Sequence, residues 1–365
     1  MHLWWLVLLA FPLLVGFGAP RVVDSAYTPA QKVRLGETAN WQLTRPDLSA
    51  TAYLLYDMDA NYILLSEHAN RPLAPASLTK LMTALLVLEA DDLESEVMVV
   101  RDDLVGGTAM GLVAGEMIRV DELLWGLLIP SGNDAAMTLA RYMGGGSVDN
   151  FVAAMNQRAR ALGLTETHFV NPHGLDADGH VSSAADMLVL VKKNWDYPLF
   201  REIVRTTETM VNGHLLRNTN QLLGTYEGTN GIKTGTTDAA GQCLIAGFQQ
   251  NGHEVVGIVL GSSDRYTDMR ALHRHYLDNY HWLVAESGSF TTLDRLQGMD
   301  GKLWYIRPQG NPPTVFMRMV EREQLVPFRR LSLPVNQQWE AGMEVGTLEW
   351  RYRNSVIGTQ PMVLW

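Results

Sequence analysis

The sequence predicts a mixed α/β (α+β) chain in which an antiparallel sheet is flanked by helices and is followed by a small all-β domain. Three observations support this fold class. Strand-like runs occupy residues 51–66 and again residues 231–263, and helical spacing of apolar residues dominates between them. From residue 286 onward, short strand-like runs are separated by Pro- and Gly-rich turns.

The composition is that of a globular protein. The chain has 365 residues, 47% of them hydrophobic, so it can bury a large core in two or more domains. The net charge of −10 argues against a general affinity for nucleic acid or for anionic membranes. The one cysteine, Cys243, permits no internal disulfide and lies in an apolar, strand-like run.

The first residues have the composition of a targeting segment. The stretch from Leu3 to about Pro20 is apolar but short for a membrane-spanning helix, which is typical of a secretory signal. We therefore expect residues 1–19 to be a signal peptide or, if uncleaved, an N-terminal anchor. This predicts an exported, periplasmic protein, which could associate with the outer face of the cytoplasmic membrane through that segment.

The elements of the first domain, residues 45–285, follow from local signals. Residues 51–66 are predicted as a hairpin, because two apolar runs enclose the turn sequence DMDAN. Helices are expected over PASLTKLMTALLVLEA, VDELLWGLLIP, NDAAMTLARYM, VDNFVAAMNQRARALG and SSAADMLVLVKKNW. Strands are expected over GIKTGTT, GQCLIAGFQQ and HEVVGIVLGSS, with an Asn-Gly turn between the last two. A closing helix is expected over residues 264–284.

The second domain, residues 286–365, is predicted to be β-rich. Its runs KLWYIRP, TVFMRMV and GTLEWRYR have strand composition and are bounded by turn residues. It contains no visible catalytic constellation, so we expect it to act as a spacer or as a platform for partners.

Ser77 and Lys80 are three residues apart at the start of an apolar helix, so their side chains can share one face. The positive end of the helix dipole disfavours a cation there. Burial would lower the pKa of the lysine and make it a base for the serine. The chain has six lysines against twenty-three arginines. Because arginine stays protonated, a lysine kept here suggests that the neutral amine is needed. The alternative is a helix cap beside a solvent-facing lysine.

The stretch PSGND contributes two more candidates. Ser131 and Asn133 follow one predicted helix and precede the next. They are either ordinary helix-starting residues or donors, acceptors and a proton path in a cleft.

The stretch GIKTGTT contributes the third set. From an edge strand, Lys233, Thr234 and Thr236 could bind a carboxylate, and Gly235 would leave room for a ligand beside the backbone. The alternative is a lysine that protects a sheet edge against aggregation.

The sequence thus contains three motifs in the order Ser-x-x-Lys, Ser-Gly-Asn and Lys-Thr-Gly. They are predicted to lie on a helix, a loop and a strand, which is the arrangement known from serine acyl-transfer enzymes that carry these motifs. The chain resembles the low-molecular-mass penicillin-binding proteins, the serine D-alanyl-D-alanine carboxypeptidases, over about residues 45–285. The resemblance is carried by RPLAPASLTKLMTALLVLEA, GLLIPSGNDAAMTLARYM, FVNPHGLDADGHVSSAADM and NGIKTGTTDAAGQCLIAGF. It implies a penicillin-binding/β-lactamase-like transpeptidase fold, peptidoglycan stem peptides as substrates, β-lactam antibiotics as covalent inhibitors, and neither cofactor nor metal.

The resemblance also implies roles for the site residues. Ser77 would be the nucleophile that forms the acyl-enzyme and Lys80 its base, and Ser131 would pass a proton to the leaving D-alanine amine. The backbone N–H groups of Ser77 and Thr236 would form the oxyanion hole. The substrate would be bound through its peptide backbone and its terminal carboxylate by Asn133, Lys233, Thr234, Gly235 and Thr236.

Two departures from the family pattern concern attachment and the carboxylate site. Thr219 stands where some members carry an arginine near the carboxylate site. Arg217 is close in the sequence, but no motif indicates that it takes the place of that arginine. Many members end in an amphipathic helix, whereas this sequence ends in the strand-like GTQPMVLW. Attachment, if any, is therefore expected through the N-terminal segment.

Four alternatives remain at this point. A related endopeptidase that cuts peptide cross-links would share every motif. A β-lactamase would need Glu-x-x-Leu-Asn, but Glu166 and Asn171 are one residue too far apart. A zinc peptidase could use HGLDADGH, although no matching partner motif occurs elsewhere. A non-catalytic wall-binding protein would be expected to have lost the motifs.

Overall fold

The computed structural model describes residues 45–285, 294–334, 338–353 and 355–365. Two compact units divide between Asp278 and Asn279, a few residues before the predicted boundary at residue 285. The segment predicted as a signal or anchor, residues 1–19, lies outside the described residues. Among the residues that are described, no helix is both long and apolar enough to cross a membrane.

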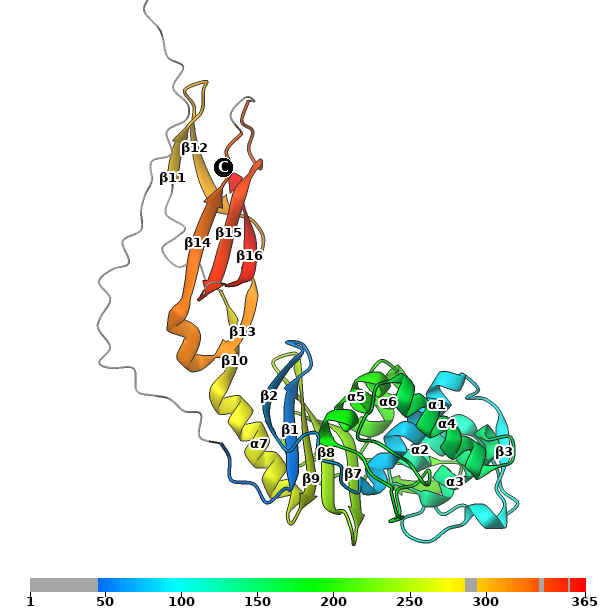
Figure 1. Ribbon diagram of the computed structural model, residues 1–365. Helices are drawn as coiled ribbons and strands as arrows, with labels where there is room; N and C mark the ends of the chain where they lie inside the picture. The colour runs from blue at the N-terminus through cyan, green and yellow to red at the C-terminus, as the bar shows by residue number, and fades with distance from the viewer. Residues whose placement is uncertain (1–44, 286–293, 335–337, 354) are drawn as a thin grey trace, which may run out of the picture. The chain divides into compact units, whose positions relative to one another are not determined.

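The first unit is built on a five-stranded antiparallel sheet with the order β2-β1-β9-β8-β7 (Figure 1). The predicted hairpin is confirmed as β1 and β2, and Asn251 and Gly252 form the turn between β8 and β9 with φ angles of 51° and 85°. The five strands are β1 (Ala52–Asp57), β2 (Tyr62–Glu67), β7 (Thr229–Thr237), β8 (Gly241–Gln250) and β9 (His253–Ser262).

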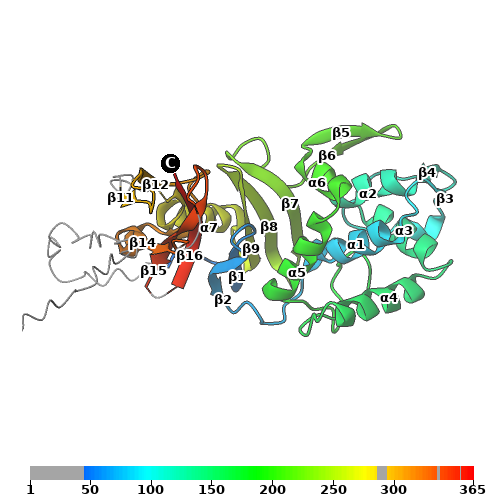
Figure 2. The same cartoon turned by 90° about the horizontal axis from the view of Figure 1, so that it is seen from above.

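The two faces of this sheet carry different helices (Figure 2). Val256 and Ile258 of β9 belong to the main core, on the side where α5 packs, whereas Gly257 faces Met269 of α7. The seven helices of the unit are α1 (Lys80–Ala90), α2 (Val120–Leu128), α3 (Asn133–Met143), α4 (Val148–Ala161), α5 (Ala184–Trp195), α6 (Pro198–Arg205) and α7 (Arg265–Asn279).

Helix α1 lies at the centre of the helical layer. It contacts α2, α3, α4 and α5, and its buried residues cover its whole circumference. A helix surrounded in this way needs no polar face, which accounts for its nearly uniform apolar sequence. The 3₁₀ turn η1 (Ala76–Thr79) precedes α1 and packs against β7 and β8.

Two short hairpins interrupt the region that the sequence analysis treats as helical and loop. They are β3 (Glu96–Met98) with β4 (Met117–Arg119), and β5 (Glu208–Val211) with β6 (His214–Arg217). Strands this short leave little periodicity in the sequence.

The closing helix is shorter than predicted. Helix α7 ends at Asn279, and the following residues form β10 (Tyr280–Val284), which pairs with β13 (Thr314–Arg318). The partner strand lies beyond any local sequence window, so its pairing overrides the helical reading of this stretch.

The second unit confirms the predicted small β domain. Its main sheet is antiparallel, with the order β11-β12-β16-β15-β14, and buries Trp304, Leu348 and Trp350 on one core. A 3₁₀ segment, η4 (Met319–Gln324), is its one described helical element. The strands are β11 (Asp294–Gln297), β12 (Leu303–Pro308), β14 (Leu325–Leu331), β15 (Glu344–Tyr352) and β16 (Ser355–Leu364).

Candidate active site

Ser77 lies in the η1 turn directly before α1 and lines a cavity. Its Oγ lies within hydrogen-bond distance of Nζ of Lys80, at 2.9 Å. The preceding residue, Ala76, has a φ of 49°, a left-handed conformation that is strained for a residue with a side chain. Its carbonyl accepts a hydrogen bond from Thr79 Oγ1 at 2.8 Å, which helps to hold the turn.

Lys80 is completely buried, and its Nζ has three partners. Besides Ser77, these are Asn133 Oδ1 at 2.7 Å and the carbonyl oxygen of His173 at 2.8 Å. Both of these oxygens can only accept hydrogen bonds. A neutral amine has two N–H groups, which the two oxygens use, so its lone pair points at the serine hydroxyl.

The environment of Lys80 favours that neutral form. Burial is the main cause that lowers its pKa well below the ordinary value, and the positive charge of Lys233 adds to the effect. The carboxylate of Asp134 opposes both. Since the helix dipole acts in the same direction as burial, the amine is suited to take a proton from Ser77.

Ser131 and Asn133 reach the same cavity from the turn between α2 and α3. Ser131 has a φ of 65°, and among the described residues its buried Oγ has no hydrogen-bond partner. Asn133 is held from both ends, because its Nδ2 donates to the carbonyl oxygen of Gly106 at 2.7 Å. A buried hydroxyl without a partner in a cavity wall is available to a substrate.

Asp134 holds the neighbouring loop against this turn. Its carboxylate oxygens accept hydrogen bonds from the backbone N–H groups of Met110, Gly111 and Leu112 at 2.8–3.1 Å. The residue after the Ser-Gly-Asn motif therefore has a structural role, which its position alone does not reveal.

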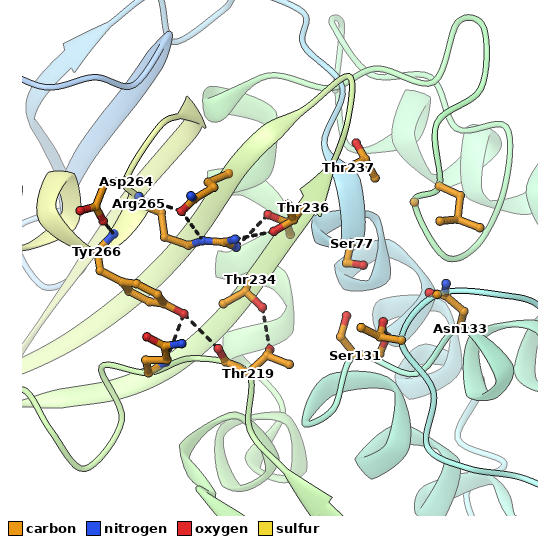
Figure 3. A pocket seen from close by; sticks show the side chains of 17 residues that line it. Ser77, Ser131, Asn133, Thr219, Thr234, Thr236, Thr237, Asp264, Arg265 and Tyr266 are labelled. Carbon is orange, nitrogen blue, oxygen red and sulfur yellow. Dashed lines mark hydrogen bonds between the residues drawn. The ribbon is translucent and has the colours of Figure 1, made fainter.

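Strand β7 forms the opposite wall (Figure 3). Lys233 is buried, and its Nζ donates to the carbonyl oxygen of Thr234 at 3.1 Å. Burial, followed by the charge of Arg265, lowers the pKa of Lys233 to about 7. The side chains of Thr234 and Thr236 line the cavity.

Gly235 has a packing role in addition to the predicted one. A Cβ atom at this position would lie 3.0 Å from Cβ of Ala76 and 3.1 Å from the backbone nitrogen of Ser77. The missing side chain therefore makes room for the nucleophile turn, which packs against the strand, and Gly235 also lines the cavity.

Arg265, which the sequence analysis did not select, is the cationic side chain that lines this cavity. It lies at the start of α7, and its Nη1 donates to the carbonyl oxygens of Gly235 and Cys243 at 2.8 and 3.0 Å. Its Nη2 donates to Thr236 Oγ1. By contrast, Arg217 is exposed and pairs with Glu208 on the β5–β6 hairpin. Among many arginines, no spacing in the sequence distinguishes Arg265.

The HGLDADGH loop is structural. Its His173 carbonyl orients Lys80, and Asp176 accepts hydrogen bonds from Thr237 Oγ1 at 2.6 Å and from the Ala239 backbone at 3.0 Å. Burial lowers the pKa of His173 and of His180 to about 4. Within the described part of the chain, no three His, Cys, Asp or Glu side chains gather as a metal site would require.

Six of the eight predicted site residues line one cavity of about 740 Å³ (Figure 3). Lys80 and Lys233 lie buried beside it, through contacts with Ser77 and with Thr234. The cavity also contains residues that the motifs do not include. Among them are Thr219, Gln221, Gln242, Arg265 and Tyr266.

Comparison with known proteins agrees with this arrangement. A family model described as D-alanyl-D-alanine carboxypeptidase matches residues 39–264. The D-alanyl-D-alanine carboxypeptidase DacF of Bacillus subtilis is 34% identical over 264 residues, 69% of this chain and 65% of that protein. DacD of Salmonella typhimurium is 31% identical over 347 residues, 87% of this chain and 86% of that protein. The chain thus spans slightly less than two thirds of the DacF length.

Solved structures show the same fold. A Streptomyces DD-transpeptidase has a TM-score of 0.60 and 28% identity, covering 64% of this chain and 99% of its own. The D-alanyl-D-alanine carboxypeptidase DacD of Francisella tularensis has a TM-score of 0.64 and covers 88% of this chain and 95% of its own. At 23% identity, the second likeness concerns the fold alone.

Proposed function

The chain belongs to the D-alanyl-D-alanine carboxypeptidase family, and on that premise we propose that it removes the terminal D-alanine from peptidoglycan pentapeptides through an acyl-enzyme on Ser77. The observation that carries the proposal is the contact between Nζ of Lys80 and Oγ of Ser77 at 2.9 Å, in a site whose burial lowers the pKa of the amine. A serine needs such a base to become a nucleophile.

In the first step, Ser77 Oγ attacks the carbonyl carbon of the penultimate D-alanine while its proton passes to Nζ of Lys80. The negative charge that develops on the carbonyl oxygen needs two donors nearby. The backbone N–H groups of Ser77 and Thr236 are suited to this role, because Gly235 lets the strand approach the nucleophile turn closely.

In the second step, the peptide C–N bond breaks and D-alanine leaves as an amine. Ser131 is suited to donate its proton to the leaving amine and to take up in its place the proton held by Lys80, because its buried hydroxyl has no partner among the described residues and lines the cavity. Lys80 is then neutral again. A water molecule then attacks the ester on Ser77, with Lys80 again as the base, and releases the shortened peptide.

The terminal carboxylate of the substrate needs a positive charge and hydrogen-bond donors. Arg265 and Lys233 supply charge beside β7, and Thr234 and Thr236 supply hydroxyl groups. Four backbone or side-chain acceptors hold the guanidinium of Arg265, so it binds as a fixed group that need not reorganise. Penicillins, which carry a carboxylate next to a strained amide, should acylate Ser77 in the same way.

A labelled penicillin tests the proposal. We expect one covalent adduct that maps to Ser77 and is absent from Ser77→Ala. The control Ser95→Ala, which changes a half-buried serine on the same unit, should still label fully. A purified pentapeptide should lose one D-alanine. Labelling of another residue, or cleavage only of cross-linked dimers, would contradict the carboxypeptidase assignment, and rapid steady hydrolysis of penicillin would indicate a β-lactamase.

We also propose that the protein is exported to the periplasm, where peptidoglycan peptides are found. The support is the apolar segment at residues 1–19, which has signal-like composition. Cell fractionation with N-terminal sequencing of the mature protein tests this. Retention in the cytoplasm would contradict it, and an intact N-terminus in the membrane fraction would indicate an anchor.

A further inference from the structure

Thr219 connects the two walls of the cavity. Its backbone N–H donates to the carbonyl oxygen of Ile129 at 3.2 Å, two residues before Ser131 on the helical side. Its carbonyl oxygen accepts a hydrogen bond from the hydroxyl of Tyr266 at 3.0 Å, at the start of α7. Its side-chain Oγ1 lies 2.6 Å from Oγ1 of Thr234 on β7 (Figure 3).

The donor in the hydrogen bond between Tyr266 and Thr219 is the Tyr266 hydroxyl. The Thr219 carbonyl can only accept, so the phenol donates to it. The backbone N–H of Gln221 donates in turn to the phenol oxygen at 3.3 Å. Tyr266 therefore sets the position of Thr219 with both of its hydrogen-bonding functions in use.

The hydroxyls of Thr234 and Thr236 have matching surroundings. Nη2 of Arg265 donates to Oγ1 of Thr236, which leaves the hydrogen of Thr236 free for the cavity. If the hydroxyl of Thr219 donates to Oγ1 of Thr234, the hydrogen of Thr234 is free in the same way. Each hydroxyl then has a donor behind its oxygen and a hydrogen directed at the ligand. Hydrogen bonds linked in this way strengthen one another.

We infer that Thr219 and Tyr266 are positioning residues that, together with Arg265, direct the hydroxyl hydrogens of Thr234 and Thr236 at the carboxylate of the substrate. The inference rests on the proposed function and explains how the site would select substrates that end in a free carboxylate. A carboxylate only accepts hydrogen bonds, so it satisfies both hydroxyls. A carboxamide places an NH₂ group against one of them and leaves two donors facing each other.

The test compares two peptides that differ only at the C-terminus, one ending in D-alanyl-D-alanine and one in its carboxamide. The acid peptide is measured as substrate, and the amide peptide as a competing ligand through its inhibition constant. In Thr219→Val we expect KM for the acid peptide to rise about tenfold, with kcat within about twofold of wild type. The inhibition constant of the amide peptide should hardly change, so discrimination falls about tenfold.

Conservative and control variants separate this role from general damage. Thr219→Ser keeps the hydroxyl and should restore discrimination between the two peptides. Tyr266→Phe should lower this discrimination about threefold, because the Thr219 backbone loses a hydrogen bond. Tyr62→Phe on β2, at an exposed position, should behave as wild type. The inference would be overturned if Thr219→Val and Tyr266→Phe weakened the binding of both peptides equally. It would also be overturned if Thr219→Ser discriminated between the peptides no better than Thr219→Val. Full turnover by Ser77→Ala would instead overturn the proposed function.

Discussion

Gly235 packs directly against the backbone of Ser77, so that a Cβ atom on the glycine would lie 3.1 Å from the serine nitrogen. Strand β7 and the turn before α1 are far apart in the sequence, and this contact sets the distance between them. The position of the nucleophile relative to this wall of the cavity therefore depends on the absence of a single methyl group.

Gly235→Ala should slow acylation by about a hundredfold with little loss of folding, because a shift of the turn by a few tenths of an ångström misplaces the serine. The rate of labelling by a fluorescent penicillin measures the effect. Gly106→Ala is the matched control, since a Cβ there meets nothing within 4 Å. Equal rates for the two variants would show that the glycine contact does not position Ser77.

Lys80→Arg should reduce the acylation rate by about 10²–10⁴-fold although positive charge is retained, because a guanidinium has no lone pair to offer Ser77. Penicillin labelling over time provides the measurement. Lys193→Arg, at an exposed position on α5, should label at the wild-type rate. Normal acylation by the Lys80 variant would exclude the neutral amine as the base.

Glu254→Gln should stabilise the protein at alkaline pH. Burial raises the pKa of Glu254 to about 7, although Asn230 donates to both carboxylate oxygens at 2.6 and 2.8 Å. The folded state holds this proton more tightly than the unfolded state, so stability falls as pH rises from about 4.5 to about 7. Glutamine does not ionise, so the variant avoids this loss, which amounts to up to about 3 kcal/mol in the free energy of unfolding above pH 7.

Urea unfolding at pH 5 and pH 8 checks the Glu254 prediction. The gain should appear at pH 8 and nearly vanish at pH 5, whereas Glu227→Gln, at an exposed position, should show no such difference. A gain of the same size at both pH values would mean that packing, rather than protonation, is responsible.

Acid should destabilise the protein through its buried histidines. The pKa of His180 is lowered to about 4 by burial, and its ring contacts Thr79 Oγ1 through Nε2 and the Val170 backbone through Nδ1. The unfolded chain takes up a proton below about pH 6.5 that the folded chain refuses, so stability falls from about pH 6.5 to about pH 4. The loss for this residue is up to about 3 kcal/mol.

His180→Gln should be less stable than wild type at pH 7 but should lose less stability between pH 6.5 and pH 4. Denaturant midpoints across that range provide the measurement. His68→Gln, at an exposed position, is the control and should leave the slope unchanged. A His180 variant with the wild-type slope would locate the acid sensitivity elsewhere.

The motif residues were predictable because their chemistry restricts the residue type and the spacing. Ser77 and Lys80 must face each other across one turn, so a serine and a lysine three residues apart are visible in any window that contains them. The same holds for the continuous apolar runs of strands β8 and β9 and for the apolar circumference of α1.

Other contributors to the site had no such signature. The carbonyl of His173 acts through the backbone, where residue identity has little influence. Arg265 and Thr219 reach the cavity only because α7 and the segment after β6 close around β7. The pairing of β10 with β13, which ends α7, likewise depends on a strand beyond any local window.

Local order along the chain was therefore enough to identify the main helices and strands, the three motifs and a lysine beside its serine, since each depends on neighbours within a few residues. Tertiary structure decided which carbonyl directs the lysine lone pair, which arginine supplies the charge, and why Gly235 must lack a side chain. Those features arise from contacts between segments far apart in the chain, whose distances no sequence period encodes.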